Sequence, residues 1–265
     1  MTISIDALER AAAPSWRALE SDQLGSWLLR ASQGFTGRAN SALATGDPGL
    51  PLADAAEKVC DWYAERSLPA MIAVPYPLNG PGNNELDQLL AALGWTSQAA
   101  AVVMTASTAN VAAAAVPDVL GIEFGAEPDA AWLGRYRYRG QDLPPIARDL
   151  LTSAPWQAFA SVRADGETIA IGRVAGAGEW AGLTAIEVDP ARRRQGLGAA
   201  VTTALTRHAA EHGYRNIYLQ VTDENASARA LYRKLGFTDH HGYHYRVARA
   251  SPLRINNLVP FQHLR

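Results

Sequence analysis

A basic, glycine-containing segment in the second half of the chain has the residue types of an anion site. It runs Ile186-Glu-Val-Asp-Pro-Ala-Arg-Arg-Arg-Gln-Gly-Leu-Gly198, and its pattern predicts a strand, a loop and the start of a helix. Free backbone N–H groups and the dipole at a helix N-terminus favour a phosphate or pyrophosphate. Gly196 and Gly198 would let phosphate oxygens approach the backbone, and Arg193 and Arg194 would add positive charge.

Other interpretations of this segment are weaker. A run of arginines is often a solvated surface patch. Arg192 to Arg194 could contact nucleic acid, but the net charge of −2 argues against a protein that clamps nucleic acid phosphates. A dinucleotide fingerprint would need a third small residue where Val201 stands, and a Walker loop would need Gly-Lys-Ser/Thr, which the sequence lacks.

A second motif follows the next predicted strand and completes a recognisable pair. It is Asn225-x-x-Ala228-x-x-Leu231-Tyr232-x-x-Leu235-Gly236-Phe237. With Arg193-x-x-Gly196-x-Gly198 before it, this segment resembles the GNAT superfamily of N-acetyltransferases. The resemblance covers about half of the chain. It implies an α/β (α+β) fold, in which helices flank a mixed sheet and two central strands splay apart to admit the pantetheine arm of acetyl-CoA.

The resemblance also implies roles for individual residues. Ile186 and Val188 would offer backbone groups to the pantetheine arm. Asn225 would hydrogen-bond near the thioester, although a helix N-cap is an equally good role for it. Tyr232 would protonate the leaving thiolate, its alternative role being a packed helix tyrosine. The residues that would hold the pyrophosphate are Arg193, Arg194, Gln195, Gly196, Leu197, Gly198 and Ala199.

The implied reaction is transfer of an acetyl group from acetyl-CoA to a primary amine of a small molecule or peptide, by direct attack in a ternary complex. The alternative is a non-catalytic acyl-CoA-binding or regulatory module. A cationic amine must lose a proton before it attacks, yet Gln220 stands where some relatives that acetylate protein N-termini carry Glu. Glu179 and Glu187 are nearby acids, but strand alternation puts Glu187 on the opposite face from Ile186 and Val188, so no base is assigned.

The two halves of the chain repeat each other. Leu93-Gly94-Trp95 precedes Leu235-Gly236-Phe237 by 142 residues, and Asp47-Pro48 precedes Asp189-Pro190 by the same offset. A fixed offset with one order of elements indicates a tandem duplication. We expect an acetyltransferase-like copy at 1–110, a catalytic copy at 120–250 and a tail at 251–265. The small-residue stretch 107–118 would be the linker.

The first copy lacks the chemistry-bearing residues of the second. Its loop, Gly49-Leu-Pro-Leu-Ala-Asp-Ala55, has no arginine, and Leu90 stands at the position of Tyr232. We therefore expect this copy to be degenerate, to bind no coenzyme, and to help to shape the acceptor pocket.

Periodicity and turn residues predict the elements of both copies. In the first copy they are helices at 5–12, 52–66 and 84–93 and strands at 25–32, 38–45, 70–74 and 99–105. In the second they are strands at 121–124, 157–163, 168–174, 180–188, 216–222 and 243–247 and helices from 128, at 198–212 and at 226–235.

Composition sets outer limits on the function. The chain has 265 residues, of which 48% are apolar, enough for two domains with cores. The single cysteine, Cys60, makes no internal disulfide, and neither it nor His240, His241 and His244 has metal-ligand spacing. No signal peptide or apolar run of ~18 residues is visible. We expect a soluble cytoplasmic protein, a monomer or homodimer, with no metal, membrane or nucleic acid partner.

Overall fold

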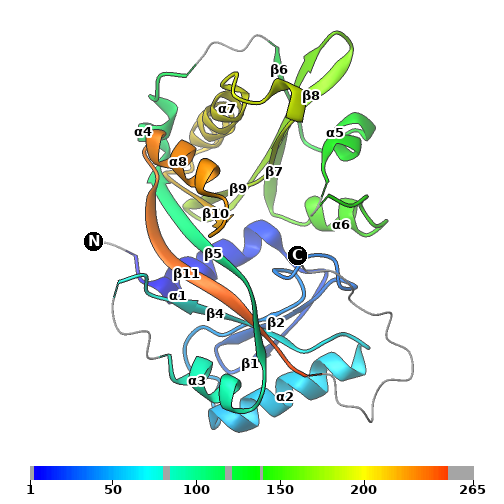
Figure 1. The fold of residues 1–265 in the computed structure, drawn as a ribbon, viewed down its shortest axis with the longest axis vertical. Helices are drawn as coiled ribbons and strands as arrows, with labels where there is room; N and C mark the ends of the chain where they lie inside the picture. Colours follow the sequence, from blue (N-terminus) through cyan, green and yellow to red (C-terminus); the bar gives the residue numbers. More distant parts are fainter. Residues whose placement is uncertain (1–2, 80–83, 117–120, 138–139, 250–265) are drawn as a thin grey trace. The chain divides into compact units, whose positions relative to one another are not determined.

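The computed structural model describes residues 3–79, 84–116, 121–137 and 140–249 (Figure 1). The predicted tail at 251–265 lies outside them. Contacts divide the chain into two compact units, neither of them contiguous. Unit 1 comprises Met1–Arg17 and Ala101–Gly242, and unit 2 comprises Ala18–Ala100 and Tyr243–Arg265. The chain crosses between the units three times, once between Arg17 and Ala18 and twice within strands, β5 (Thr96–Ser107) and β11 (Thr238–Val247).

Unit 1 contains a mixed sheet in the order β5-β10-β9-β8-β7-β6. Strands β9 and β10 are parallel, and the other pairs are antiparallel. Its strands besides β5 and β11 are β6 (Ile122–Gly125), β7 (Trp156–Ala164), β8 (Glu167–Ala177), β9 (Trp180–Val188) and β10 (Asn216–Thr222). Its helices are α1 (Ile5–Ala12), η1 (Ala13–Trp16), α4 (Thr108–Ala112), α5 (Ala130–Arg135), α6 (Ala147–Leu151), η2 (Pro190–Arg192), α7 (Leu197–Glu211) and α8 (Ala226–Lys234).

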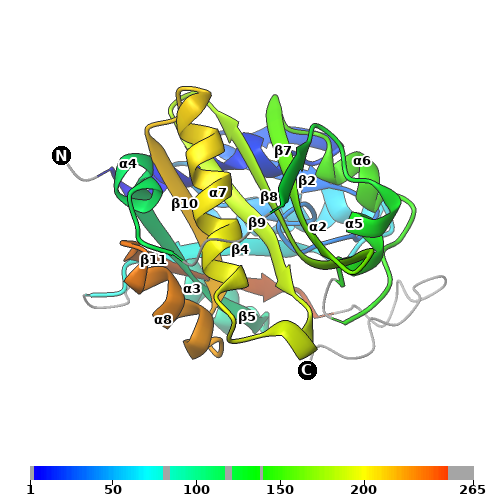
Figure 2. The ribbon, with the colours of Figure 1, turned by 90° about the horizontal axis from the view of Figure 1, so that it is seen from above.

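Helix α7 covers one face of this sheet (Figure 2). The face is built around Gly172 of β8, where an added Cβ would lie 2.8 Å from Val201 Cγ1 and 2.7 Å from Leu205 Cδ1. The glycine is required because only a position without a side chain lets the helix approach the strand this closely.

The opposite face of the unit 1 sheet is covered by α5, α6, η1 and α1. The Trp132 ring of α5 packs edge-on against Phe159, which pairs with Arg173 of β8. The fully buried Arg173 guanidinium donates to Leu151 O of α6 at 2.8 Å and to Ser15 O of η1 at 3.1 Å. Because these contacts fix the helices to the strands, the unit is a helix–sheet–helix sandwich.

Unit 2 repeats this pattern with fewer elements. Its strand order is β1-β2-β3-β4-β11-β5. The strands are β1 (Glu20–Leu24), β2 (Trp27–Ala31), β3 (Ala42–Leu43) and β4 (Met71–Tyr76), and the helices are α2 (Leu52–Glu65) and α3 (Glu85–Ala92). Strand β2 pairs antiparallel with both β1 and β3, and β3 pairs parallel with β4. Strands β7 to β10 have the same succession of pairings in unit 1.

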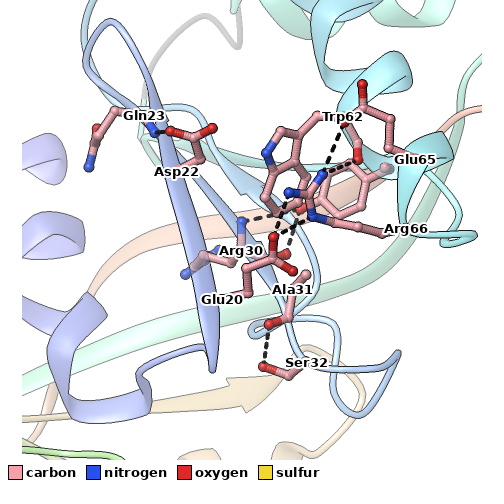
Figure 3. A network of polar contacts seen from close by, with 10 residues as sticks. Glu20, Asp22, Gln23, Arg30, Ala31, Ser32, Trp62, Glu65 and Arg66 are labelled. Atoms are coloured by element: carbon pink, nitrogen blue, oxygen red, sulfur yellow. Dashed lines mark hydrogen bonds and ion pairs between the residues drawn. The ribbon is translucent and has the colours of Figure 1, made fainter.

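An arginine fastens the edge strand of unit 2 to its long helix (Figure 3). Arg66 donates to Trp62 O at 2.7 Å, and so satisfies a carbonyl in the last turn of α2. Its guanidinium carbon lies 3.6 Å from the Trp62 ring centroid, and its Nε donates to Glu20 of β1 at 2.8 Å. One side chain thus pairs with the Glu20 carboxylate, stacks on the Trp62 ring and caps the C-terminus of α2.

The tandem duplication is visible in the bounds of the elements. Shifted by 142 residues, α3 falls on α8 and Thr96, the first residue of β5, falls on Thr238, the first residue of β11. The final strands of the copies are exchanged. The strand beside β10 is β5, from the first copy, and the strand beside β4 is β11, from the second. This exchange, together with the assignment of residues 1–17 to unit 1, is why each compact unit draws on both halves of the sequence.

Most predicted elements are confirmed, and the differences are local. The expected linker at 107–118 is wrong in its first part, because Ser107 ends β5 and Thr108–Ala112 form α4; 117 and 118 lie outside the described residues. The strand expected at 38–45 is only β3, because Asn40 organises a loop there: its Oδ1 accepts from Ser32 N and Gly34 N at 2.8 and 2.9 Å. Within the described residues, no helix is both long and apolar enough to span a bilayer.

Candidate functional site

The parallel ladder between β9 and β10 ends before either strand does. Asn216–Leu219 pair with Trp180–Leu183, and the described pairing stops there. Beyond that point β10 continues along β5, with Gln220 opposite Val103, and β9 continues along β8. The two central strands therefore separate after Leu183 and Leu219, which is the splay that the family resemblance implies.

A bulge in β9 decides which way the following side chains face. Ala185 has φ 53°, and the register with β8 shifts between Ile171 and Arg173. After the bulge, Ile186 faces α7, because its Cγ1 lies 3.4 Å from a Cβ placed on Gly172. Val188 faces the same way, with Cγ2 3.8 Å from a Cβ placed on Gly198 of α7.

Glu187, between these two residues, faces the other side of the sheet. Its Oε1 and Oε2 accept from the backbone N–H of Arg137, just after α5, at 3.2 and 3.3 Å. The alternation expected from the sequence is therefore present. What the sequence did not show is that Ile186 and Val188 point into the core under α7, which leaves Glu187 as the carboxylate on the face covered by α5.

The loop after β9 leads directly into an uncapped helix. Arg194 has φ 62°, and Gly196 has φ 83° and is the N-cap of α7, with no side chain capping the helix. The free N–H groups of the first turn therefore point into the loop. Arg192 to Gln195 are exposed, whereas the side chains of Leu197 and Ala199 are buried. Those two residues can contact a ligand only through the backbone.

The second motif converges on the same place. A Cβ on Gly198 would lie 3.5 Å from Leu231 Cδ2 of α8 and 3.8 Å from Val188 Cγ2, so the start of α7, the end of β9 and α8 meet there. Asn225 is the N-cap of α8, and its Oδ1 accepts from Ala228 N at 3.1 Å. The structure thus confirms the N-cap role that the sequence offered for Asn225.

Tyr232 follows Leu231 on α8 and is half-buried. Its ring packs edge-on against Phe237 at a centroid distance of 5.8 Å. Burial raises the pKa of Tyr232 to about 12, because the phenolate would be desolvated. The hydroxyl is therefore a proton donor at neutral pH. The packing contact with Phe237 is the structural role that the sequence offered as the alternative for this tyrosine.

Two ion pairs that spacing did not predict surround the end of β9. Arg135 lies 2.8 Å from Asp189, and Arg137 pairs with Asp142. The pKa of Asp189 is lowered, first by the hydrogen bond from Ala191 N–H and then by the Arg135 charge. Burial raises the pKa of Glu187, opposed by the Arg137 N–H and by the charges of Arg135, Arg193 and Arg137.

The corresponding position of unit 2 is an open groove of about 890 Å³ between the loop after β3, the start of α2 and α3. Its lining residues are Gly46, Asp47, Pro48, Leu50, Pro51, Leu52, Ala53, Glu85, Gln88, Leu89 and Ala92. None of these residues is cationic. Where unit 1 carries Arg192 to Arg194, unit 2 therefore offers carboxylates and apolar side chains, which do not attract a pyrophosphate.

Similarity to known proteins covers nearly the whole chain. A family model described as probable histone acetyltransferase Rv0428c, C-terminal, matches residues 2–246. The chain belongs to this family. It is 30% identical over 260 residues to the probable histone acetyltransferase Rv0428c of Mycobacterium tuberculosis, covering 94% of this chain and 76% of that protein. It is 28% identical over 260 residues to the uncharacterized N-acetyltransferase YobR of Bacillus subtilis, covering 92% of this chain and 99% of that protein.

Solved structures confirm the fold of the family. A GCN5-related N-acetyltransferase from Kribbella flavida matches 94% of this chain and 98% of its own, with TM-score 0.69 and 18% identity. A tandem GNAT protein from the clavulanic acid biosynthesis pathway matches 71% of this chain and 66% of its own, with TM-score 0.54 and 17% identity. The chain is a GNAT superfamily N-acetyltransferase with a mixed α/β fold and a tandem arrangement.

Proposed function

We propose that unit 1 transfers the acetyl group of acetyl-CoA to a primary amine of a small molecule or peptide, by direct attack in a ternary complex. The observation that carries this proposal is the parting of β9 and β10 beside an uncapped, arginine-flanked helix N-terminus. The free edge of β9 would accommodate an extended amide chain, and the N-terminus of α7 would accommodate a pyrophosphate.

The free edge of β9 suits the pantetheine arm. Strand β9 beyond Leu183 uses one edge to pair with β8, and in the described residues its other edge has no partner strand. Backbone N–H and C=O groups on such an edge need hydrogen-bond partners, and the two amides of a pantetheine arm supply them. Ile186 and Val188 would make these contacts through the backbone, since their side chains are turned to α7.

The loop from Arg193 to Ala199 suits the pyrophosphate. Gly196 in the left-handed region presents the first N–H groups of α7, and the helix dipole adds a favourable field. Exposed Arg193 and Arg194 can pair with phosphate oxygens, and Gln195 can donate from its amide. The contribution of Leu197, Gly198 and Ala199 would come from the backbone alone.

Tyr232 is the proposed proton donor to the departing thiolate. Its hydroxyl stays protonated at neutral pH, and it sits beside Leu231, which reaches the start of α7. Asn225 would contribute its amide nitrogen near the thioester, because its Oδ1 is already engaged in capping α8. These groups orient the reactants and manage protons, which is most of what this acyl transfer requires.

The acceptor is proposed by class. An amine is the nucleophile that an N-acetyltransferase needs, and the description of the matched family, probable histone acetyltransferase, adds protein amines to the candidates. A panel should therefore include free amino acids, polyamines, aminoglycosides and lysine-containing peptides.

Two measurements test this proposal together. Calorimetry with acetyl-CoA should give one site per chain, since the first copy has no cation at the matching groove. Thiol release should then depend on an added amine. Coenzyme binding without amine-dependent release would instead support the alternative, a non-catalytic acyl-CoA-binding or regulatory module, and two equivalent sites would refute the degenerate first copy.

A further inference from the structure

We propose that Glu187 is the general base that takes the proton from the ammonium form of the acceptor. This assignment rests on the acetyl transfer proposed above and adds the residue that the sequence did not identify. Glu187 lies on the splayed part of β9, between Ile186 and Val188, whose backbone groups would hold the coenzyme in the function proposed above.

The proposal places the coenzyme and the acceptor on opposite faces of the sheet. The loop, the N-terminus of α7 and Leu231 of α8 meet at Gly198, on the side of α7. A coenzyme held there occupies that side of the splay, so the amine must approach the thioester carbon from the other side. The Glu187 side chain faces that other side, where Arg137 N–H contacts it at 3.2 Å.

The orientation follows from the bulge. Before it, Thr184 pairs with Arg173 on the face of α5 and α6, and after it Ile186 turns toward Val201 and Leu205 of α7. Without the extra residue at Ala185, simple alternation would place Ile186 with Thr184 and turn Glu187 into the core under α7. The bulge therefore brings a carboxylate to the acceptor side of the strand.

The charged groups facing Glu187 come from two elements. Arg135 is the last residue of α5 and Arg137 follows shortly after it, while Arg193 comes from the coenzyme loop. Arg135 is paired with Asp189 and Arg137 with Asp142. Two of the three cations near Glu187 are thus already neutralised by other carboxylates.

Burial has the larger effect on this carboxyl and raises the pKa of Glu187 in spite of these arginines. An amine has an ordinary pKa of about 10.4 and a Glu about 4.3. Raising the pKa of the Glu carboxyl narrows its difference from the pKa of the amine, which makes the proton transfer less unfavourable. A half-buried carboxylate beside an unpaired strand edge is therefore better suited to the task than an exposed one.

The proton balance of the step is complete. The ammonium gives one proton to the Glu187 carboxylate, and the freed lone pair forms the N–C bond with the thioester carbon. The C–S bond breaks and its electron pair leaves with sulfur, which receives the Tyr232 proton. The second nitrogen proton returns Tyr232 to its neutral form, and Glu187 releases its proton to water. One proton is liberated for each amide formed.

The other candidate acids and amides fit less well. Gln220 cannot accept a proton at neutral pH. Glu179 lies in the turn before β9, where its side chain is 71% exposed and 4.0 Å from Arg215. It is eight residues from Glu187 along the strand, about 26 Å at the usual strand rise, which makes it a matched control of the same chemistry outside the site.

The test compares Glu187→Gln with Glu179→Gln in the full chain, using the best acceptor of the amine panel. We expect Glu187→Gln to lower kcat about 10²- to 10⁴-fold at pH 7 and to leave acetyl-CoA affinity unchanged. The wild type should lose kcat/KM toward acid pH as Glu187 is protonated, and this limb should be absent from the residual activity of Glu187→Gln. Glu179→Gln should match the wild type in rate and pH profile.

The stability of the Glu187→Gln variant distinguishes a catalytic role of Glu187 from a merely structural one. A carboxyl with a raised pKa is ionised at neutral pH at a cost to the folded state, so Glu187→Gln should be at least as stable as the wild type. A structural Glu187 would instead give a less stable variant whose acid limb persists, and either that result or an unchanged rate overturns the assignment. If the wild type itself acetylates no amine, the proposed function fails first.

Discussion

Gly196 allows a prediction in which backbone strain and coenzyme binding can be separated. The residue has φ 83° at the N-terminus of α7, and Gly213 has φ 89° just beyond the C-terminus of the same helix, with open space around its Cβ position. A leucine at either position would adopt the left-handed conformation, which costs the folded state roughly 1–2 kcal/mol in both cases. Both variants should therefore lose similar stability in urea denaturation.

Coenzyme affinity should distinguish Gly196→Leu from Gly213→Leu. At Gly196 the side chain would block the approach of phosphate oxygens to the first N–H groups of α7. A hydrogen bond to a charged group contributes about 1.5–3 kcal/mol, so the loss of one predicts an affinity roughly 10- to 150-fold weaker. Calorimetry with acetyl-CoA measures this. Gly213→Leu should bind normally.

Equal coenzyme affinity in the two leucine variants would refute the assignment of the loop. A milder change, Gly196→Ala, covers the case in which the leucine variant does not fold. It places only a Cβ at the same point and should weaken binding less than leucine does. An alanine variant that binds as tightly as the wild type, together with normal binding by the leucine variant, would exclude the α7 N-terminus as the pyrophosphate site.

Three further predictions concern catalysis, folding and pH. Tyr232→Phe should lower kcat about 10²- to 10⁴-fold with coenzyme affinity nearly unchanged, and an unaltered rate in a thiol-release assay would leave only packing as its role. A fragment of residues 115–265 should show no cooperative melt by circular dichroism, because it lacks 101–107 of β5, which pair with β10; a cooperative melt would contradict this. Burial, aided by the His212 charge, lowers the pKa of His208. Protonation then favours the unfolded state, so stability should fall as pH drops below about 6.5, and His208→Gln should weaken that loss in pH-dependent denaturation.

Elements with strong local signals were predictable from the sequence. The predicted bounds of α1 and β10 agree with the structure, because Ser4 caps the helix and β-branched residues mark the strand. Strand β1, Glu20–Leu24, was missed, since this edge strand is nearly all polar and exposed and shows no alternation. The exchange of β5 and β11 could not be predicted, because periodicity identifies strands but not their partners.

The sequence motifs of the candidate site were predictable, but the face of the sheet on which each side chain of β9 lies was not. Arg193, Gly196 and Asn225 lie on the loop, helix start and N-cap that their spacing indicates. The side of the sheet on which Glu187 lies depends on a left-handed Ala185, and an alanine gives no sign of a positive φ. Strand alternation correctly placed Glu187 opposite Ile186 and Val188, but it could not show which of these residues face α7.

Initial rates with acetyl-CoA and an amine varied together test the central claim most directly. Thiol release and the acetylated amine should form in equal amounts, only when both substrates are present. The double-reciprocal lines should intersect, as direct attack in a ternary complex requires. Parallel lines would indicate a covalent acetyl-enzyme, and thiol release that does not depend on the amine would contradict the proposed transfer altogether.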